Sequence, residues 1–211
     1  MKILVLGASQ GTGALAVRVA IERGHDVTAF SRNPDKLALA NANLAKRAGN
    51  FHDRDSVDQA VRGHDAIIVT ASATSFRAFK DKPHYFSEGT AYTIDAMKAH
   101  GVRRLVVLSA LGSGDSRRIM GIFFDKIVVS FLLKAPFADH DRQEQMVRES
   151  GLDWVIARPA RLTNGPLAKR YVATAELKRV PASISRADVA DFLVTAAETD
   201  AWVRKAVQLG G

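Results

Sequence analysis

Near the start of the chain stands the stretch Lys2-Ile3-Leu4-Val5-Leu6-Gly7-Ala8-Ser9-Gln10-Gly11-Thr12-Gly13. Its apolar run is typical of a buried strand in a parallel sheet. The glycines permit a tight turn, and residues 14–23 follow with helical spacing. The turn therefore opens onto a helix N-terminus, where free amides and the helix dipole favour an anion. Gly24 ends that helix and residues 26–30 form a second strand, so the whole unit predicts a dinucleotide site.

The spacing of these glycines is G-x-x-x-G-x-G, which differs from the commoner G-x-G-x-x-G. An ordinary strand–turn–helix that needs glycine only for its backbone conformation is the alternative interpretation. Strand, glycine turn, helix and second strand all occur here in the required order, and this favours the dinucleotide site.

The end of the second strand indicates which dinucleotide binds. NAD sites usually place an acidic residue there to accept hydrogen bonds from the ribose hydroxyls. This strand instead ends Phe30-Ser31-Arg32-Asn33, with no carboxylate until Asp35. An arginine suits a 2′-phosphate, which it can pair through two charge-assisted hydrogen bonds. We therefore expect Arg32 to favour NADP(H) over NAD(H), the alternative being a solvated surface arginine.

The 211 residues suit one domain over 1–211, with 47% hydrophobic and 25% charged residues. There is no cysteine, which excludes disulfides and thiolate nucleophiles, and the first residues do not resemble a signal peptide. We expect a cytoplasmic protein. The net charge of +8 comes from scattered basic pairs without interleaved aromatic residues, so no nucleic-acid partner is expected. No histidine has a partner pattern for metal binding, and we predict no metal site.

Strands and helices continue to alternate along the chain. The patterns predict helices at 34–44, 55–62, 83–100, 139–150 and 185–198, and strands at 45–48, 65–70, 103–109, 153–159 and 206–209. This alternation predicts an α/β protein with a Rossmann-type doubly wound parallel sheet, flanking helices and a small C-terminal excursion on the substrate side. The cofactor is expected across the carboxyl ends of the strands.

The segment Ile119–Leu133 interrupts this rhythm with an almost continuous apolar run. It is shorter than the roughly 20 residues of a membrane span, and Asp125-Lys126 divides it. A mostly buried helix is expected. A substrate lid and a subunit interface, as in a homodimer, are the alternatives, because so apolar a segment must be covered.

Several motifs along the chain occur together in one protein family. They are the glycine turn, Ser31-Arg32, Thr70-Ala71-Ser72, residues 96–102, Leu108-Ser109-Ala110, residues 148–154 and Arg158-Pro159. On these motifs the chain resembles the atypical short-chain dehydrogenase/reductases over essentially its whole length. Within them it is most similar to the NAD(P)H-binding group that includes the biliverdin reductase B (flavin reductase) and NmrA-like proteins.

The resemblance implies a role for each matching residue. The residues implied to hold the pyrophosphate are Gly7, Ser9, Gln10, Gly11, Thr12 and Gly13. Those implied along the rest of the cofactor are Arg32 at the 2′-phosphate, Asn50 and Phe51 beside the adenine, Ala71 and Ser72 against the nicotinamide ribose, and Pro159 and Ala160 behind the nicotinamide ring. Ser109 stands where many relatives place a catalytic serine.

The chain also departs from its relatives in the catalytic residues. Typical short-chain dehydrogenases pair a tyrosine with a lysine four residues later, but Tyr85, Tyr92 and Tyr171 have no lysine at that spacing. Glu144 occupies the position of a histidine in the biliverdin reductase B-like pattern, and His140 lies one turn earlier. If Glu144 is desolvated, it can act as a general acid. The alternative is that it is an ordinary solvated glutamate on a helix surface, with no catalytic role.

A reductase without that tyrosine needs to hold the nicotinamide close to an electrophilic atom and to exclude water. Ser109 could donate a hydrogen bond to a developing oxyanion, worth roughly 3 kcal/mol, or simply bond to backbone. Arg77 is the candidate for the arginine that relatives carry in the loop after Ala71. We expect an NADPH-dependent oxidoreductase acting on a flavin-, quinone- or other conjugated carbonyl-type acceptor. The alternatives are a non-catalytic NADP(H)-binding redox sensor of the NmrA type and a nucleotide-sugar epimerase or dehydratase.

Overall fold

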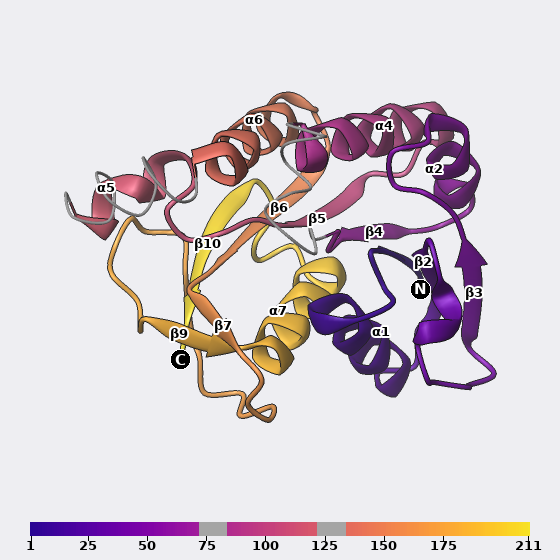
Figure 1. The fold of residues 1–211 in the computed structure, drawn as a ribbon, viewed down its shortest axis with the longest axis horizontal. Coiled ribbons are helices and arrows are strands. Elements are labelled where there is room, and N and C mark those ends of the chain that lie inside the picture. The colour runs from indigo at the N-terminus through magenta and orange to yellow at the C-terminus, as the bar shows by residue number, and fades with distance from the viewer. Residues whose placement is uncertain (72–83, 122–133) are drawn as a thin grey trace.

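The computed structural model describes residues 1–71, 84–121 and 134–211 (Figure 1). The helices in these ranges are α1 (Gly11–Glu22), η1 (Pro34–Lys36), α2 (Arg54–Val61), α4 (Tyr85–His100), η2 (Gly114–Ser116), α5 (Arg117–Met120), α6 (Lys134–Glu149) and α7 (Arg186–Glu198). The strands are β1 (Lys2–Leu6), β2 (Asp26–Ser31), β3 (Leu44–Ala48), β4 (Ala66–Val69), β5 (Arg104–Leu108), β6 (Asp153–Pro159), β7 (Arg161–Thr163), β8 (Val172–Thr174), β9 (Ser183–Ser185) and β10 (Lys205–Gly210).

Eight of the described strands form one sheet in the order β3-β2-β1-β4-β5-β6-β10-β8. All neighbours in it run parallel except β8, which pairs antiparallel with β10. The chain leaves β1 toward β2 and β3 and then crosses back to β4, so the strand order reverses between β1 and β4. Open α/β sheets bind their ligands at such a switch point. The expected doubly wound sheet is therefore confirmed.

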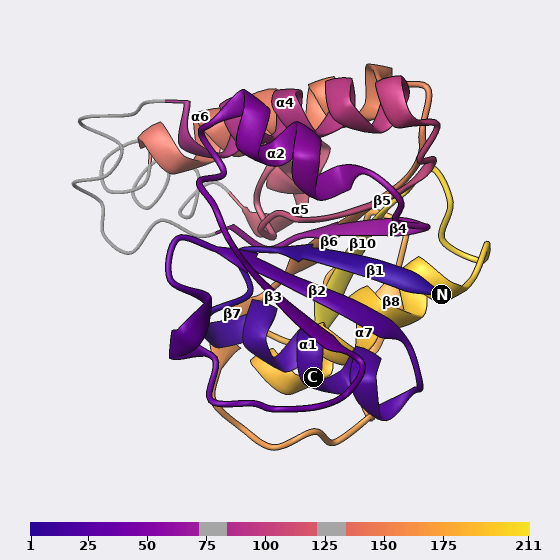
Figure 2. The same ribbon diagram turned by 90° about the vertical axis from the view of Figure 1, so that its right-hand side faces the viewer.

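Helices cover both faces of this sheet, with α1 and α7 on one side and α2, α4 and α6 on the other (Figures 1 and 2). Side chains of a strand alternate between the two faces, and in β1 both faces are buried. Ile3 and Val5 join the core under α1 and α7, whereas Leu4 and Leu6 join the core under the other helices. This two-sided burial explains why the strand is apolar throughout.

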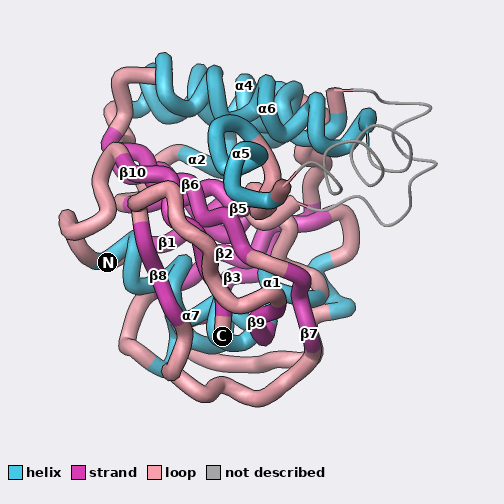
Figure 3. The backbone as a smooth tube through the Cα atoms, turned by 90° about the vertical axis from the view of Figure 1, so that its left-hand side faces the viewer, coloured by secondary structure: helices cyan, strands magenta, loops and turns pink. Residues whose placement is uncertain are grey.

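The C-terminal part of the chain adds the small excursion that the sequence suggested. β7 and β9 pair in a second, two-stranded sheet, and β8 closes the edge of the main one. Figure 3 shows α5, β8 and the β7–β9 pair together on the side that carries the C-terminal half of the sheet. These three short strands were not predicted, because three residues are too few to show a periodic pattern.

The predicted helix over residues 34–44 is wrong. Only the single turn η1 forms, and residues 37–43 reach β3 without regular secondary structure. Leu37 is buried and Leu39 half-buried, but the other side chains from residue 38 to residue 43 are exposed, so a helix here would have no apolar face to bury. The side chain of Asn41 accepts a hydrogen bond from the amide of Asn43, a local turn that competes with helix.

The apolar segment Ile119–Leu133 is described only at its start, where α5 ends at Met120. The expected buried helix over residues 122–133 lies outside the described residues, and so do Ser72 and Arg77. Across the described ranges, no helix is both long enough and apolar enough to cross a bilayer.

Replacement of the N-terminal cap of α2 is expected to cost a measurable part of the stability. The carboxylate of Asp53 accepts a hydrogen bond from the amide of Ser56 at 2.8 Å, one of the amides that a helix start leaves without a partner. We expect Asp53→Ala to lower the free energy of unfolding by about 1 kcal/mol in urea titrations. Asp53→Ser, which keeps a capping oxygen, should stay close to the wild type, and equal losses in both variants would contradict the capping role.

Candidate cofactor site and active-site serine

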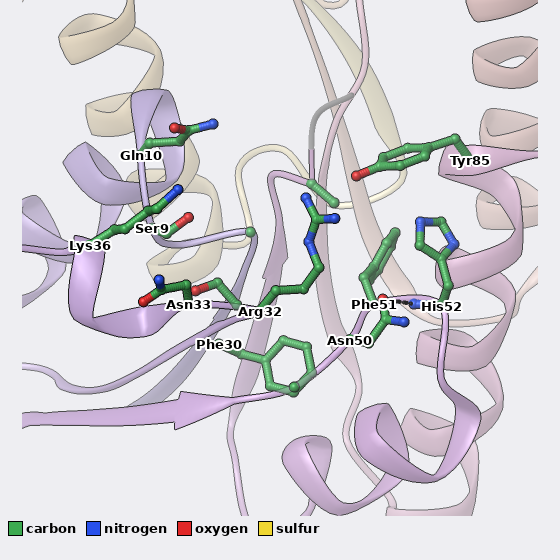
Figure 4. A pocket seen from close by; sticks show the side chains of 14 residues that line it. Ser9, Gln10, Phe30, Arg32, Asn33, Lys36, Asn50, Phe51, His52 and Tyr85 are labelled. Atoms are coloured by element: carbon green, nitrogen blue, oxygen red, sulfur yellow. Dashed lines mark hydrogen bonds between the residues drawn. The ribbon is translucent and has the colours of Figure 1, made fainter. Parts of the chain in front are cut away.

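A cleft of about 350 Å³ opens at the carboxyl ends of β1, β2 and β4 (Figure 4). It lies at the reversal point of the strand order, where a dinucleotide is expected. Its lining residues are Gly7, Ser9, Gln10, Phe30, Ser31, Arg32, Asn33, Lys36, Gly49, Asn50, Phe51, His52, Ala71 and Tyr85.

The glycine turn forms one end of this cleft. Gly7 has a φ of +92°, and a Cβ placed on it would lie 2.7 Å from the amide nitrogen of Ala71. A Cβ on Gly13 would lie 2.3 Å from the carbonyl oxygen of Gly7, so the start of α1 packs directly on the turn. Gln10 caps α1 in an extended conformation, and its side chain makes no capping hydrogen bond within the described chain. The first amides of α1 thus remain available for an anion such as a pyrophosphate.

Two cations stand beside that turn. Arg32 extends into the middle of the cleft, and Lys36 lies next to Ser9 (Figure 4). Within the described ranges, neither cation forms a salt bridge or a side-chain hydrogen bond, and no described lining residue carries a carboxylate. An unpaired guanidinium and an unpaired ammonium in a cleft without acidic groups suit a phosphate.

The opposite wall of the cleft is aromatic. Phe51, His52 and Tyr85 lie together there (Figure 4), with the ring centroids of His52 and Tyr85 4.5 Å apart. The backbone amide of His52 donates to the side-chain oxygen of Asn50 at 3.1 Å. Nδ1 of the His52 ring lies 3.0 Å from a carboxylate oxygen of Glu88. These contacts fix the edge of the wall, which offers flat surfaces to a planar ring.

Many of the expected cofactor residues come together in this cleft, namely Gly7, Ser9, Gln10, Arg32, Asn50, Phe51 and Ala71. Gly11, Thr12 and Gly13 form the first turn of α1 directly after it, and Pro159 ends β6 two strands away from β4. Sequence reasoning missed Lys36, His52 and Tyr85. Lys36 follows Arg32 by four residues and could have been found as a second cation, whereas Tyr85 comes from a distant helix and carries no local signal.

Ser109 lies directly after β5, at the same edge of the sheet as the cleft. Its amide donates to the carbonyl of Ala157 at 2.8 Å, which ties it to β6. Within residues 1–71, 84–121 and 134–211, its side chain makes no hydrogen bond to backbone. Instead, the hydroxyl donates to Oε1 of Glu144 at 2.7 Å, and both residues are buried, at 5% and 2% exposure.

Glu144 is held in turn by Arg158, whose side chain is fully buried. Nε of Arg158 donates to Oε1 of Glu144 at 2.9 Å, Nη2 pairs with Oε2, and Nη1 donates to Asp115 at 2.5 Å. Burial opposes the charge of Arg158, but hydrogen bonds and charges from Glu144 and Asp115 outweigh it and raise the pKa of Arg158. Burial likewise opposes the charge of Asp115, whose pKa is nevertheless lowered by Arg158 and Arg148. Arg158 and Asp115 are therefore both ionised.

His140 lies on α6, one helical turn before Glu144, and is not among the residues that line the cleft. Its ring stacks on Phe86 with centroids 4.0 Å apart, and its Nδ1 lies 2.9 Å from the side-chain oxygen of Gln143. Burial lowers the pKa of His140, more strongly than Gln143 and the nearby carboxylates raise it. The ring is consequently neutral near pH 7.

Comparison with known proteins gives a consistent result. A family model described as NAD(P)H-binding matches residues 7–200. The 2-alkyl-3-oxoalkanoate reductase of Stenotrophomonas maltophilia is 31% identical over 79% of this chain, which spans 52% of that enzyme's length. Among solved structures, a short-chain dehydrogenase/reductase from Veillonella parvula in complex with NADP aligns with a TM-score of 0.82 at 19% identity, covering 100% of this chain and 94% of that one. ChuY, an anaerobillin reductase from Escherichia coli O157:H7, aligns with a TM-score of 0.81 at 22% identity, covering 100% and 97%.

Proposed function

Because this chain belongs to the NAD(P)H-binding family, we propose that it is an NADPH-dependent reductase of a flavin-, quinone- or other conjugated carbonyl-type acceptor. The observation that carries the choice of NADPH is the pair of unpaired cations, Arg32 and Lys36, in a cleft whose described lining has no carboxylate. An NAD-selective site would place an acidic side chain there, against the ribose hydroxyls.

In this proposal the cleft residues bind and orient the coenzyme. The glycine turn and the free amides of α1 hold the pyrophosphate, and Arg32 and Lys36 hold the 2′-phosphate. Asn50 and the aromatic wall take the adenine, and Ala71 takes the nicotinamide ribose. Bound NADPH supplies a hydride from its nicotinamide, and a solvent proton completes the reduction of the acceptor.

The remaining residues act at the nicotinamide end. Ser109 directly follows β5 and Pro159 ends the neighbouring strand β6, on the far side of Ala71, where the ring is expected to lie. Conjugated acceptors delocalise the charge that hydride transfer brings, so no strong acid has to stand beside them. Glu144 is paired with Arg158 and has no proton to give, so we assign it no role as a general acid.

Two measurements test this function. Isothermal titration should show NADPH binding more tightly than NADH, and NADPH oxidation should rise above background with at least one member of a panel of flavins, quinones and bilins. Binding without turnover of any acceptor would favour a redox sensor instead. No heat with either nucleotide would refute the assignment of the cleft.

A further inference from the structure

The hydrogen bond between Ser109 and Glu144 has a fixed direction. Glu144 accepts two hydrogen bonds from the guanidinium of Arg158, one at each carboxylate oxygen, and this pairing keeps it ionised. An ionised carboxylate can only accept, so the proton in the 2.7 Å contact belongs to Ser109. A serine hydroxyl has a single proton to donate, and here it is already used.

The rest of the network leaves Glu144 no freedom to turn away. Arg158 is fully buried and is anchored at its other end by Asp115. A Cβ on Gly114 would lie 2.5 Å from Nη2 of Arg158 and 2.8 Å from Oε2 of Glu144, so the loop after β5 closes tightly over the pair. Oε1 of Glu144, which faces Ser109, is thus held by Nε of Arg158, while Nη2 of Arg158 holds the other carboxylate oxygen.

We propose that Glu144, positioned by Arg158, keeps Ser109 as a hydrogen-bond acceptor, so that the substrate group bound at Ser109 presents an N–H or O–H rather than a bare carbonyl oxygen. This inference rests on the proposed reductase function, and it narrows the substrate class. A lactam, amide or pyrrole N–H next to the reduced group fits the lone pairs of Ser109. A quinone, which offers only carbonyl oxygens, does not. Under this proposal Ser109 accepts a hydrogen bond from the substrate, whereas the sequence led us to expect that it would donate one to an oxyanion.

The direction of the hydrogen bond can be observed without any turnover. A joint neutron and X-ray structure of the deuterated protein, alone and with NADP⁺, would locate the deuterium on Oγ of Ser109. We expect it on the line to Oε1 of Glu144 in both states. A deuterium that points toward the cofactor cleft would overturn the proposal, whatever the enzyme reduces.

A matched pair of acceptors tests the consequence for substrate choice. Isatin and N-methylisatin are both vicinal dicarbonyl compounds, and they differ at one lactam nitrogen, which carries a hydrogen only in isatin. We expect kcat/KM of the wild type to be about tenfold higher for isatin than for N-methylisatin, because a tenfold ratio corresponds to the net contribution of one hydrogen bond. Ser109→Ala should abolish the preference and Ser109→Thr should retain it. Equal rates with the two compounds, or a preference for N-methylisatin, would count against the proposal.

Variants of Glu144 separate positioning from general stability. Glu144→Gln removes the ionised acceptor with little change of shape, and we expect it to reduce the isatin preference. Because Glu144 acts through Ser109, the double variant with Ser109→Ala should be no worse than Ser109→Ala alone, whereas independent effects would add. Glu149→Gln, an exposed change on the same helix, serves as the control. If neither compound is reduced, the proposed acceptor class fails, while the neutron map still decides the role of Ser109.

Discussion

Replacing both Arg32 and Lys36 by alanine is expected to raise the Kd for NADPH by about 100-fold or more, while the Kd for NADH stays within about twofold. Each cation is expected to make charge-assisted hydrogen bonds worth about 1.5–3 kcal/mol with the 2′-phosphate, and NADH has no phosphate there. Both side chains stand in the cleft without an ionic partner in the described part of the chain, so no existing contact offsets the loss.

Isothermal titration with each nucleotide measures this effect directly. Arg32→Ala alone should raise the Kd for NADPH at least tenfold. A guanidinium can bind a phosphate through two hydrogen bonds in a fixed geometry, whereas an ammonium cannot. Arg62→Ala is the control, because it removes the same charge from an exposed position outside the cleft lining. An equal loss of NADPH and NADH affinity would contradict a 2′-phosphate site and would point to a general effect on the fold.

The cofactor end of this site could be predicted from sequence because its parts are contiguous. The strand, the glycine turn and the helix that we propose hold the pyrophosphate occupy the first residues of the chain, and Arg32 follows directly at the end of β2. The continuous apolar run in β1 reflects burial on both faces, which is a property that the sequence records. Comparison with known proteins then confirmed the expected family and the Rossmann-type fold.

The remaining parts of the site depend on contacts that no local pattern records. Lys36 follows Arg32 by four residues, but only the fold shows that η1 brings its side chain into the cleft. Tyr85 reaches the aromatic wall of the cleft from the start of α4. The most consequential case is Glu144. Whether Glu144 can give a proton depends on its pairing with Arg158. Arg158 lies on β6, and the helical pattern around Glu144 cannot reveal this partner.

Breaking the buried pair between Glu144 and Arg158 is expected to cost about 3–5 kcal/mol in the free energy of unfolding. Arg158→Met fills much of the same volume but leaves the carboxylate of Glu144 buried and without its cation. Asp115 loses the same partner, but its side chain is 45% exposed and can be solvated. Urea denaturation should therefore show a large loss for Arg158→Met, whereas Arg148→Met, which removes a half-exposed arginine from the same region, should cost less than about 1 kcal/mol.

The double variant Arg158→Met, Glu144→Leu distinguishes the net contribution of the ion pair to stability from the destabilisation caused by a buried carboxylate without its cation. With both ionised groups gone and apolar side chains in their place, the stability is expected to return to within about 1 kcal/mol of the wild type, because burying the two ions is itself costly. The isatin preference should not return with it, since Ser109 has lost the acceptor that holds its proton. Recovery of both properties would mean that the pair serves packing alone. Recovery of stability without the preference would mean that this part of the core retains two buried charges in order to orient one hydroxyl at the edge of the sheet.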